Sequence, residues 1–88
     1  MSHKHARVLE AIFHDPVSGN IHMRDVESLL HHLGVTIESG HGARMRLIFN
    51  KVEGTLSRPH HSGVCEKHDI RHLREFLKAA GIGPHSAG

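Results

Sequence analysis

The chain has 88 residues, with 11 lysines and arginines, 9 acidic residues and a single cysteine, Cys65. A domain of this size buries only roughly 60% of the surface that its unfolded chain exposes, which argues against a deep, water-free active-site cavity. One cysteine excludes an intramolecular disulfide, and no apolar stretch reaches the roughly 18 to 20 residues of a membrane span. Because the N-terminus also lacks the apolar core of a signal peptide, we expect a cytoplasmic protein.

The charges are distributed unevenly along the chain. Residues 1–43 hold three basic and five acidic side chains, whereas residues 44–88 hold eight basic and four acidic ones. This bias favours an anionic partner, with nucleic acid first, although it is equally consistent with an ordinary solvated surface. The 12 histidines are spread over the whole chain. Most are expected to be polar surface residues that gain charge below about pH 7.

Two helices are predicted in the first third of the chain. Apolar residues recur at helical spacing at Ala6, Leu9, Ile12 and Phe13. They predict a helix over residues 4–14, which the turn residues that follow bring to an end. A second apolar stripe has the i, i+3, i+4, i+7 pattern and consists of Val26, Leu29, Leu30 and Leu33. With acidic residues in its first turn and Gly34 placed to cap its end, it predicts a helix over residues 23–33.

Three strands are predicted next, because apolar and polar side chains alternate. They cover residues 35–38, 44–49 and 55–58, with turn residues at 39–42 and 50–54 and a proline that ends the third strand. The side chains expected to face solvent on this sheet are Thr36, Glu38, Arg44, Arg46 and Ser57. Short links between consecutive strands predict an antiparallel meander.

A last helix is predicted after a loop at residues 60–67. It begins at His68 or Asp69 and runs to Ala80, and Gly81 stands where a left-handed cap is expected. The sequence therefore predicts an α+β fold of order α-α-β-β-β-α with a three-stranded antiparallel sheet. Laying the helices on one face of the sheet buries both apolar surfaces most simply.

Three landmarks within residues 25–82 resemble the HicA family of toxins. Residues 29–34, LLHHLG, close a helix before a strand and a glycine turn with basic residues. Residues 58–60, RPH, close the third strand, and residues 73–82, LREFLKAAGI, look like the closing helix of that family. On this basis residues 1–88 form a single domain. Residues 1–20 are an N-terminal helical extension, residues 21–83 the HicA-like core and residues 84–88 a frayed tail.

The resemblance implies a double-stranded-RNA-binding-domain-like fold and an mRNA interferase activity. HicA toxins are endoribonucleases that use one histidine in the glycine turn, need no cofactor and are silenced by a HicB antitoxin. The chemistry is reasonable, since RNA carries its own 2′-hydroxyl nucleophile and a histidine can move the proton. The expected partners are therefore mRNA and a HicB-like protein, with no membrane, and a homo-oligomer is left open.

The glycine turn departs from the pattern of the family. In the HicA family the turn has the sequence Gly-Ser-His. A gapless alignment from Gly34 puts the catalytic histidine of the family on Arg44 of this chain. A guanidinium stays protonated at physiological pH, so Arg44 cannot serve as a general base. His41, three residues earlier and flanked by glycines, is the candidate catalytic residue. The alternative is that His41 is an ordinary solvated turn residue.

Basic side chains of the sheet and of the loop after it form the candidate RNA site. They are Arg44, Arg46, Arg58, His60 and His61. The arginines would bind phosphates, unless they merely keep an exposed face soluble. The two histidines would assist them, unless they are only polar loop residues. Since the chain has no Trp or Tyr, recognition should involve backbone and shape rather than base stacking.

Two rival functions remain open beside an RNA-cleaving toxin. The first is a non-catalytic RNA- or protein-binding module of the same fold, which Arg44 in the histidine position favours. The second is a histidine-rich metal-binding protein, because Cys65, His68 and His72 have the spacing Cys-x2-His-x3-His. A chain with 12 histidines produces such spacings by chance, so no residue is assigned as a metal ligand.

Overall fold

The computed structural model describes residues 3–17, 19–59 and 63–85. It has the predicted α+β class, and the order of its elements is α1 (His3–Phe13), α2 (Met23–Leu33), β1 (Thr36–Ser39), β2 (Arg44–Phe49), β3 (Val52–Ser57) and α3 (Lys67–Ala79). The strands form one antiparallel sheet in the order β1-β2-β3, which confirms the predicted meander. No helix in the described ranges is long and apolar enough to cross a bilayer.

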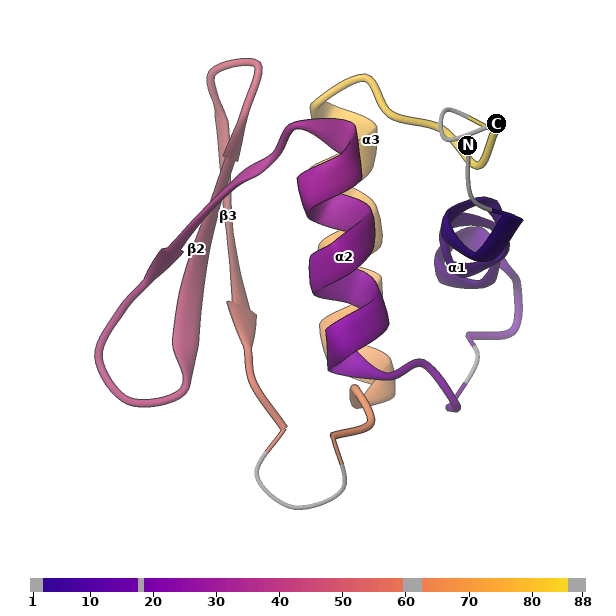
Figure 1. Ribbon diagram of the computed structural model, residues 1–88, viewed down its shortest axis with the longest axis horizontal. Coiled ribbons are helices and arrows are strands. Elements are labelled where there is room, and N and C mark those ends of the chain that lie inside the picture. The colour runs from indigo at the N-terminus through magenta and orange to yellow at the C-terminus, as the bar shows by residue number, and fades with distance from the viewer. Residues whose placement is uncertain (1–2, 18, 60–62, 86–88) are drawn as a thin grey trace.

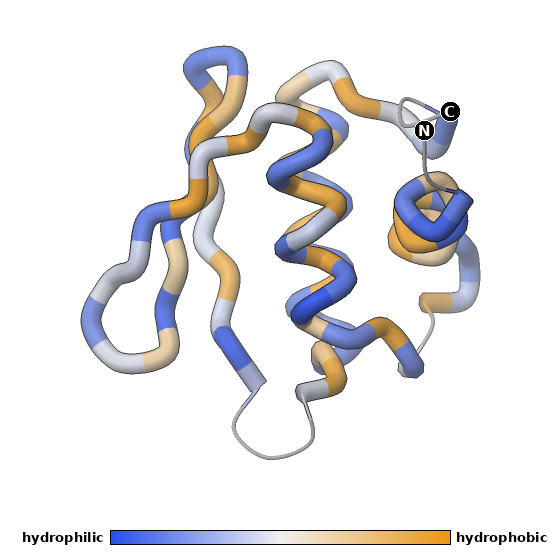
Figure 2. The backbone as a smooth tube through the Cα atoms, in the orientation of Figure 1, coloured by the Kyte–Doolittle hydropathy of each residue, from blue (hydrophilic) through white to orange (hydrophobic). Residues whose placement is uncertain are grey.

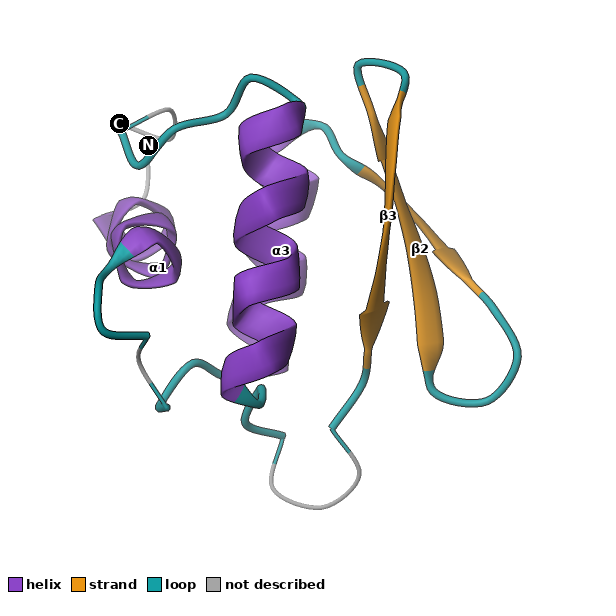
Figure 3. Ribbon diagram, turned by 180° about the vertical axis from the view of Figure 1, so that it is seen from behind, coloured by secondary structure: helices purple, strands orange, loops and turns teal. Residues whose placement is uncertain are grey.

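The elements form three layers, with the sheet at one side and α1 at the other (Figures 1 and 3). Helices α2 and α3 cover the same face of the sheet, where α2 contacts β1 and α3 contacts β3. Helix α1 packs across α2 and α3 on the side away from the sheet. The sequence predicted helices on one face, and the structure adds that the first helix is stacked on the other two. The other sheet face is left uncovered by the described helices.

Strand β2 shows why one sheet face is buried and the other is not. Met45 and Leu47 are each 1% exposed, as is Leu56 of β3, which pairs with Met45. The arginines that alternate with them in β2 are exposed. Apolar positions also recur between hydrophilic ones along α2 in Figure 2. Together these side chains join one core that extends through all three layers.

Both predicted glycine caps are confirmed. Gly34 has a φ of 87°, and the amide of Val35 after it donates to the Leu30 carbonyl at 2.9 Å. Gly81 has a φ of 84°, and the amide of Ile82 after it donates to the Leu77 carbonyl at 2.8 Å. These bonds satisfy carbonyl groups that the ends of α2 and α3 would otherwise leave without partners.

The turn between β2 and β3 is shorter than the sequence predicted. Only Asn50 and Lys51 form it, with φ values of 53° and 65°, and β3 begins at Val52. Two consecutive residues with positive φ are typical of the tight hairpin turn whose twist matches that of paired strands. The prediction of a turn over residues 50–54 is therefore wrong, and the third strand is Val52–Ser57 instead of residues 55–58.

The sequence predicts Gly54 in the turn, but the structure places it in β3 opposite Leu47. A Cβ atom at this position would lie 2.7 Å from Cδ1 of Phe76 in α3. A glycine inside a strand often marks such a close approach, because any side chain would keep the neighbouring element away. Gly54 thus allows α3 to pack directly on the sheet.

Arg74 of α3 forms hydrogen bonds with backbone carbonyls at the C-terminal end of α1. Its Nε donates to the Ile12 carbonyl at 2.9 Å and its Nη2 to the His14 carbonyl at 2.7 Å. The last turn of α1 contains no basic residue of its own. The guanidinium from α3 therefore supplies both the hydrogen-bond donors and the positive charge that a helix C-terminus favours.

We expect the substitution Gly54→Ala to destabilise the fold by about 1 to 3 kcal/mol, because the added methyl group must displace Phe76. The free energy of unfolding in urea measures this loss. Gly83→Ala is the matched control, since a Cβ atom at Gly83 meets nothing within 4 Å and its backbone lies outside the left-handed region. Equal stability of the two variants would contradict the close packing of α3 on β3.

Candidate nucleic-acid interface

The uncovered sheet face carries polar side chains from all three strands. Strand register and alternation place eight residues on it, namely Thr36, Glu38, Arg44, Arg46, Ile48, Glu53, Thr55 and Ser57. All the side chains that the sequence assigned to solvent are in this set, and each of them is exposed. Two arginines and two glutamates among the eight balance each other. The face as a whole therefore has no net charge.

Arg46 lies between the two glutamates of this face. Its Nη1 is 3.8 Å from Oε1 of Glu38 in β1, and its Nη2 pairs with Oε1 of Glu53 in β3. The three side chains are each 54–55% exposed. Arg46 thus links the two edge strands across β2, and its positive charge is already neutralised within the sheet.

Sequence reasoning missed the role of Glu53. It was assigned to the turn after β2, where a glutamate has no defined direction. In the sheet, Glu53 pairs in register with Ile48 and points to the same face as Arg46. A predicted turn limited to residues 50 and 51 would have identified this position. With β3 starting at Val52, alternation puts Glu53 on the solvent side of the sheet.

Arg58 follows β3 and lies beside the turn between β1 and β2. Its backbone amide donates to the Ala43 carbonyl in that turn at 2.8 Å. Its guanidinium Nη1 lies 3.3 Å from Oε1 of Glu27 in α2, with the arginine side chain 47% exposed. Arg58 is therefore held at the end of the sheet on the side of α2, whereas Arg44 belongs to the uncovered face, and one carboxylate partly offsets the charge of Arg58.

His41 is exposed in the turn that joins β1 to β2. The amide of Gly40 donates to the Arg44 carbonyl at 2.8 Å, and the amide of Arg44 donates to the His41 carbonyl at 3.3 Å. Because residues 40–43 lie outside the strands, strand alternation does not fix the direction of the His41 ring. Gly42 supplies a positive φ of 63° beside it.

The turn and the strand ends bring three of the predicted site residues to the same end of the sheet. Arg44 begins β2, and it pairs with Ser57, the residue before Arg58. His41 lies in the turn that leads into Arg44. We call His41, Arg44 and Arg58 the sheet-end cluster. Arg46, two residues further along β2, lies outside it, and His60 and His61 lie outside the described residues.

Cys65 does not join the histidines that the sequence spacing grouped with it. Its side chain is buried, at 2% exposure, and its backbone amide donates to the Ile21 carbonyl. Burial, followed by the negative charges of Asp69 and Glu27, raises the pKa of the thiol to about 11. A thiol that resists ionisation is a poor zinc ligand and a poor nucleophile.

Comparison of the chain with models of protein families, with curated proteins and with solved structures finds no match.

We expect Cys65 to react slowly with iodoacetamide in the folded protein. A rise of its pKa from 9.0 to about 11 lowers the thiolate fraction near pH 8 by about 100-fold, and burial slows access further. Mass spectrometry should show slow labelling that accelerates as the pH approaches 11, and fast labelling in urea. Equal rates in folded and unfolded protein would contradict a buried, neutral thiol.

Proposed function

We propose that this chain is an RNA-binding protein of the HicA type, and that it binds mRNA through the sheet-end cluster. The order α2, β1, β2, β3, α3, with both helices on one sheet face, agrees with the double-stranded-RNA-binding-domain-like core that the resemblance implies. This agreement supports the proposal. Helix α1 then extends that core on the side away from the sheet, where it leaves the RNA surface open.

The observation that carries the proposal is the position of two arginines and one exposed histidine around one turn. Arg58 is bonded through its backbone to the same turn that holds His41 and leads into Arg44. Arginines bind phosphate oxygens through several parallel hydrogen bonds, which fixes the path of an RNA backbone. The two glutamates beside Arg46 outnumber its single positive charge at the centre of the sheet, which makes the centre a weaker site for an anion, so RNA should be held at the end of the sheet.

The chemistry available at this cluster is cleavage without a metal ion. His41 would accept the proton of a ribose 2′-hydroxyl, and the 2′-oxygen would then attack the adjacent phosphorus. The bond from phosphorus to the 5′-oxygen breaks, and that oxygen takes a proton from water or from the imidazolium. The products are a 2′,3′-cyclic phosphate and a 5′-hydroxyl. Arg44 would stabilise the charge that builds up on the phosphate.

A second candidate is an RNA-binding module that does not cleave. Arg44 occupies the position of the family's histidine, and a guanidinium can hold a phosphate but cannot accept the proton. If His41 is only a solvated turn residue, the cluster retains two phosphate-binding arginines and has no general base. Binding would survive in this case, whereas cleavage would not occur.

The partner that fits either form is a HicB-like antitoxin that covers the sheet-end cluster. An acidic or neutral protein surface over His41 and Arg44 would block RNA without entering a deep cavity. Because mRNA is the proposed substrate, the protein would act in the cytoplasm.

Cleavage of a labelled mRNA in EDTA tests the proposal. Wild type should cut the RNA, His41→Ala should lose at least about 100-fold in rate through loss of the general base, and Arg44→Ala should lose affinity in a gel shift. The matched control is His31→Ala, which removes an exposed histidine that belongs to α2 and not to the turn.

Each outcome decides between the candidates. Cleavage that is lost only in His41→Ala supports the toxin reaction. RNA that is bound but stays intact identifies the non-catalytic module. Failure of the wild-type protein to bind RNA at all, at 50 mM salt, would contradict both.

A further inference from the structure

The start of α3 brings together side chains that the RNA proposal does not use. Glu66, His68 and Asp69 each offer one ligand atom, and these atoms lie within 4.8 Å of one another. Within the described part of the chain they are the group of histidine, cysteine and acidic residues that meets this condition. We propose that this group forms a site for a divalent transition-metal ion, and that the ion is zinc. The ligands would be His68, Asp69, Glu66 and His72.

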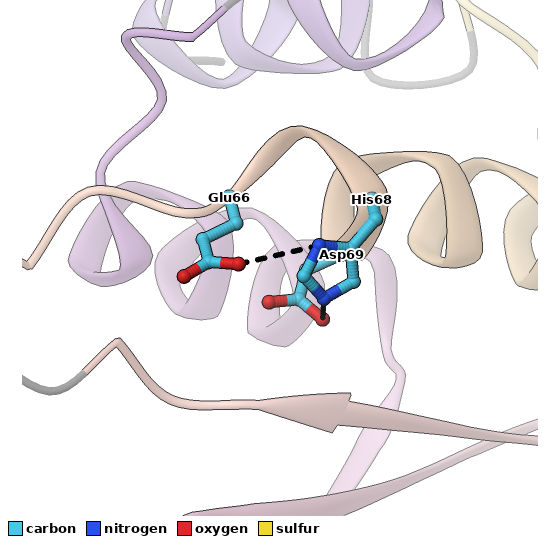
Figure 4. Close-up of side chains that lie close together, drawn as sticks. All are labelled: Glu66, His68 and Asp69. Carbon is cyan, nitrogen blue, oxygen red and sulfur yellow. Dashed lines mark ion pairs between the residues drawn. The ribbon is translucent and has the colours of Figure 1, made fainter.

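The imidazole of His68 lies between the two carboxylates, as Figure 4 shows. Its Nδ1 is 3.2 Å from Oε2 of Glu66, and its Nε2 is 3.4 Å from Oδ1 of Asp69. Two ligand atoms that are each about 2.1 Å from a tetrahedral zinc ion are about 3.4 Å apart. The spacing of Nε2 and the Asp69 oxygen is therefore already that of two ligands on one ion.

The two carboxylates differ in how firmly they are held. The Asp69 side chain is only 13% exposed, so its carboxylate is a metal ligand with little freedom to move. Glu66 is the N-cap residue of α3 but makes no capping hydrogen bond, and its side chain is 70% exposed. Glu66 is thus free to turn from Nδ1 towards an ion held by Nε2. Its carboxylate also offsets the unfavourable placement of a cation near a helix N-terminus.

His72 would supply the fourth ligand atom after its ring rotates, since it does not belong to the group whose ligand atoms lie within 4.8 Å of one another. It lies four residues after His68, on the same face of α3, and the two rings are in edge contact with their centroids 6.1 Å apart. Residues at i and i+4 of a helix are neighbours, and a pair of histidines at this spacing can bind one zinc ion. His72 is exposed, so its ring can rotate towards an ion without disturbing the core.

The donor set selects the class of metal. Imidazole nitrogen suits zinc, copper and nickel, whereas calcium and magnesium take oxygen donors. Two histidines and two carboxylates give zinc four ligands without a cysteine, and Cys65 is itself buried. The site is exposed, so the ion should exchange freely instead of holding the fold together. This proposal does not rest on RNA binding, and it replaces the donor set that the sequence spacing suggested.

Zinc titration of the 15N-labelled protein, followed by its amide NMR spectrum at pH 7.5, tests the site. Wild type should show saturable shifts centred on residues 66–72, and His68→Ala and Asp69→Asn should each weaken binding at least about tenfold. His31→Ala is the matched control, because it removes an exposed histidine from a different helix and should leave the affinity unchanged.

Cobalt gives a second readout from the same samples, since its paramagnetism broadens amides close to the ion. Broadening confined to the start of α3 and lost in His68→Ala supports the site. Shifts spread evenly over the histidines of the chain, or an affinity unaffected by either substitution in α3, would overturn it. The His68 side chain is 61% exposed, whereas Asp69 lies in the first turn of α3 and is only 13% exposed. An unchanged amide spectrum away from residues 66–72 therefore verifies that the fold of each variant is intact.

Discussion

The burial of one face of the sheet under α2 and α3 constrains the rest of the structure. Met45 and Leu47 enter the core from β2, each 1% exposed. Burying a side chain of this size contributes about 1.5 to 3 kcal/mol. Because side chains alternate along a strand, a one-residue shift of β2 would exchange them with Arg44 and Arg46. The positions of both arginines on the outer face are therefore consequences of core packing.

The outer face that results is polar but electrically balanced, and this decides where an anion is best held. Exposed ion pairs such as those of Arg46 contribute only about 0 to 1 kcal/mol each to stability. Their main effect is to cancel charge at the centre of the sheet. At its end, Arg44 on the uncovered face and Arg58 on the side of α2 lie next to the turn that carries His41. Glu27 is the carboxylate that pairs with Arg58 there. For this reason the proposed RNA backbone is placed across the end of the sheet and not over its centre.

Local patterns predicted most of the fold, but contacts between distant residues lay beyond them. Helix periodicity, strand alternation and glycine caps depend on neighbours in sequence, and they identified α2 and β2 with their observed bounds. Gly54 looked like a turn residue because its partner, Phe76, belongs to another helix. That error also hid Glu53 from the candidate site. Likewise, nothing local indicates that Arg74 caps α1. The candidate histidine and arginines were identified from sequence, whereas the charge balance around them required the structure.

The most direct test of the proposed RNA site is a map of the amides that respond to RNA. A short single-stranded RNA added to the 15N-labelled His41→Ala protein, which cannot cut it by the proposed route, should shift amides at residues 40–44 and 57–58. Amides at the centre of the sheet, near Arg46, should respond less. Shifts confined to α1 or to the exposed side of α3, with none in the turn between β1 and β2, would contradict the sheet-end cluster as the place where this protein holds RNA.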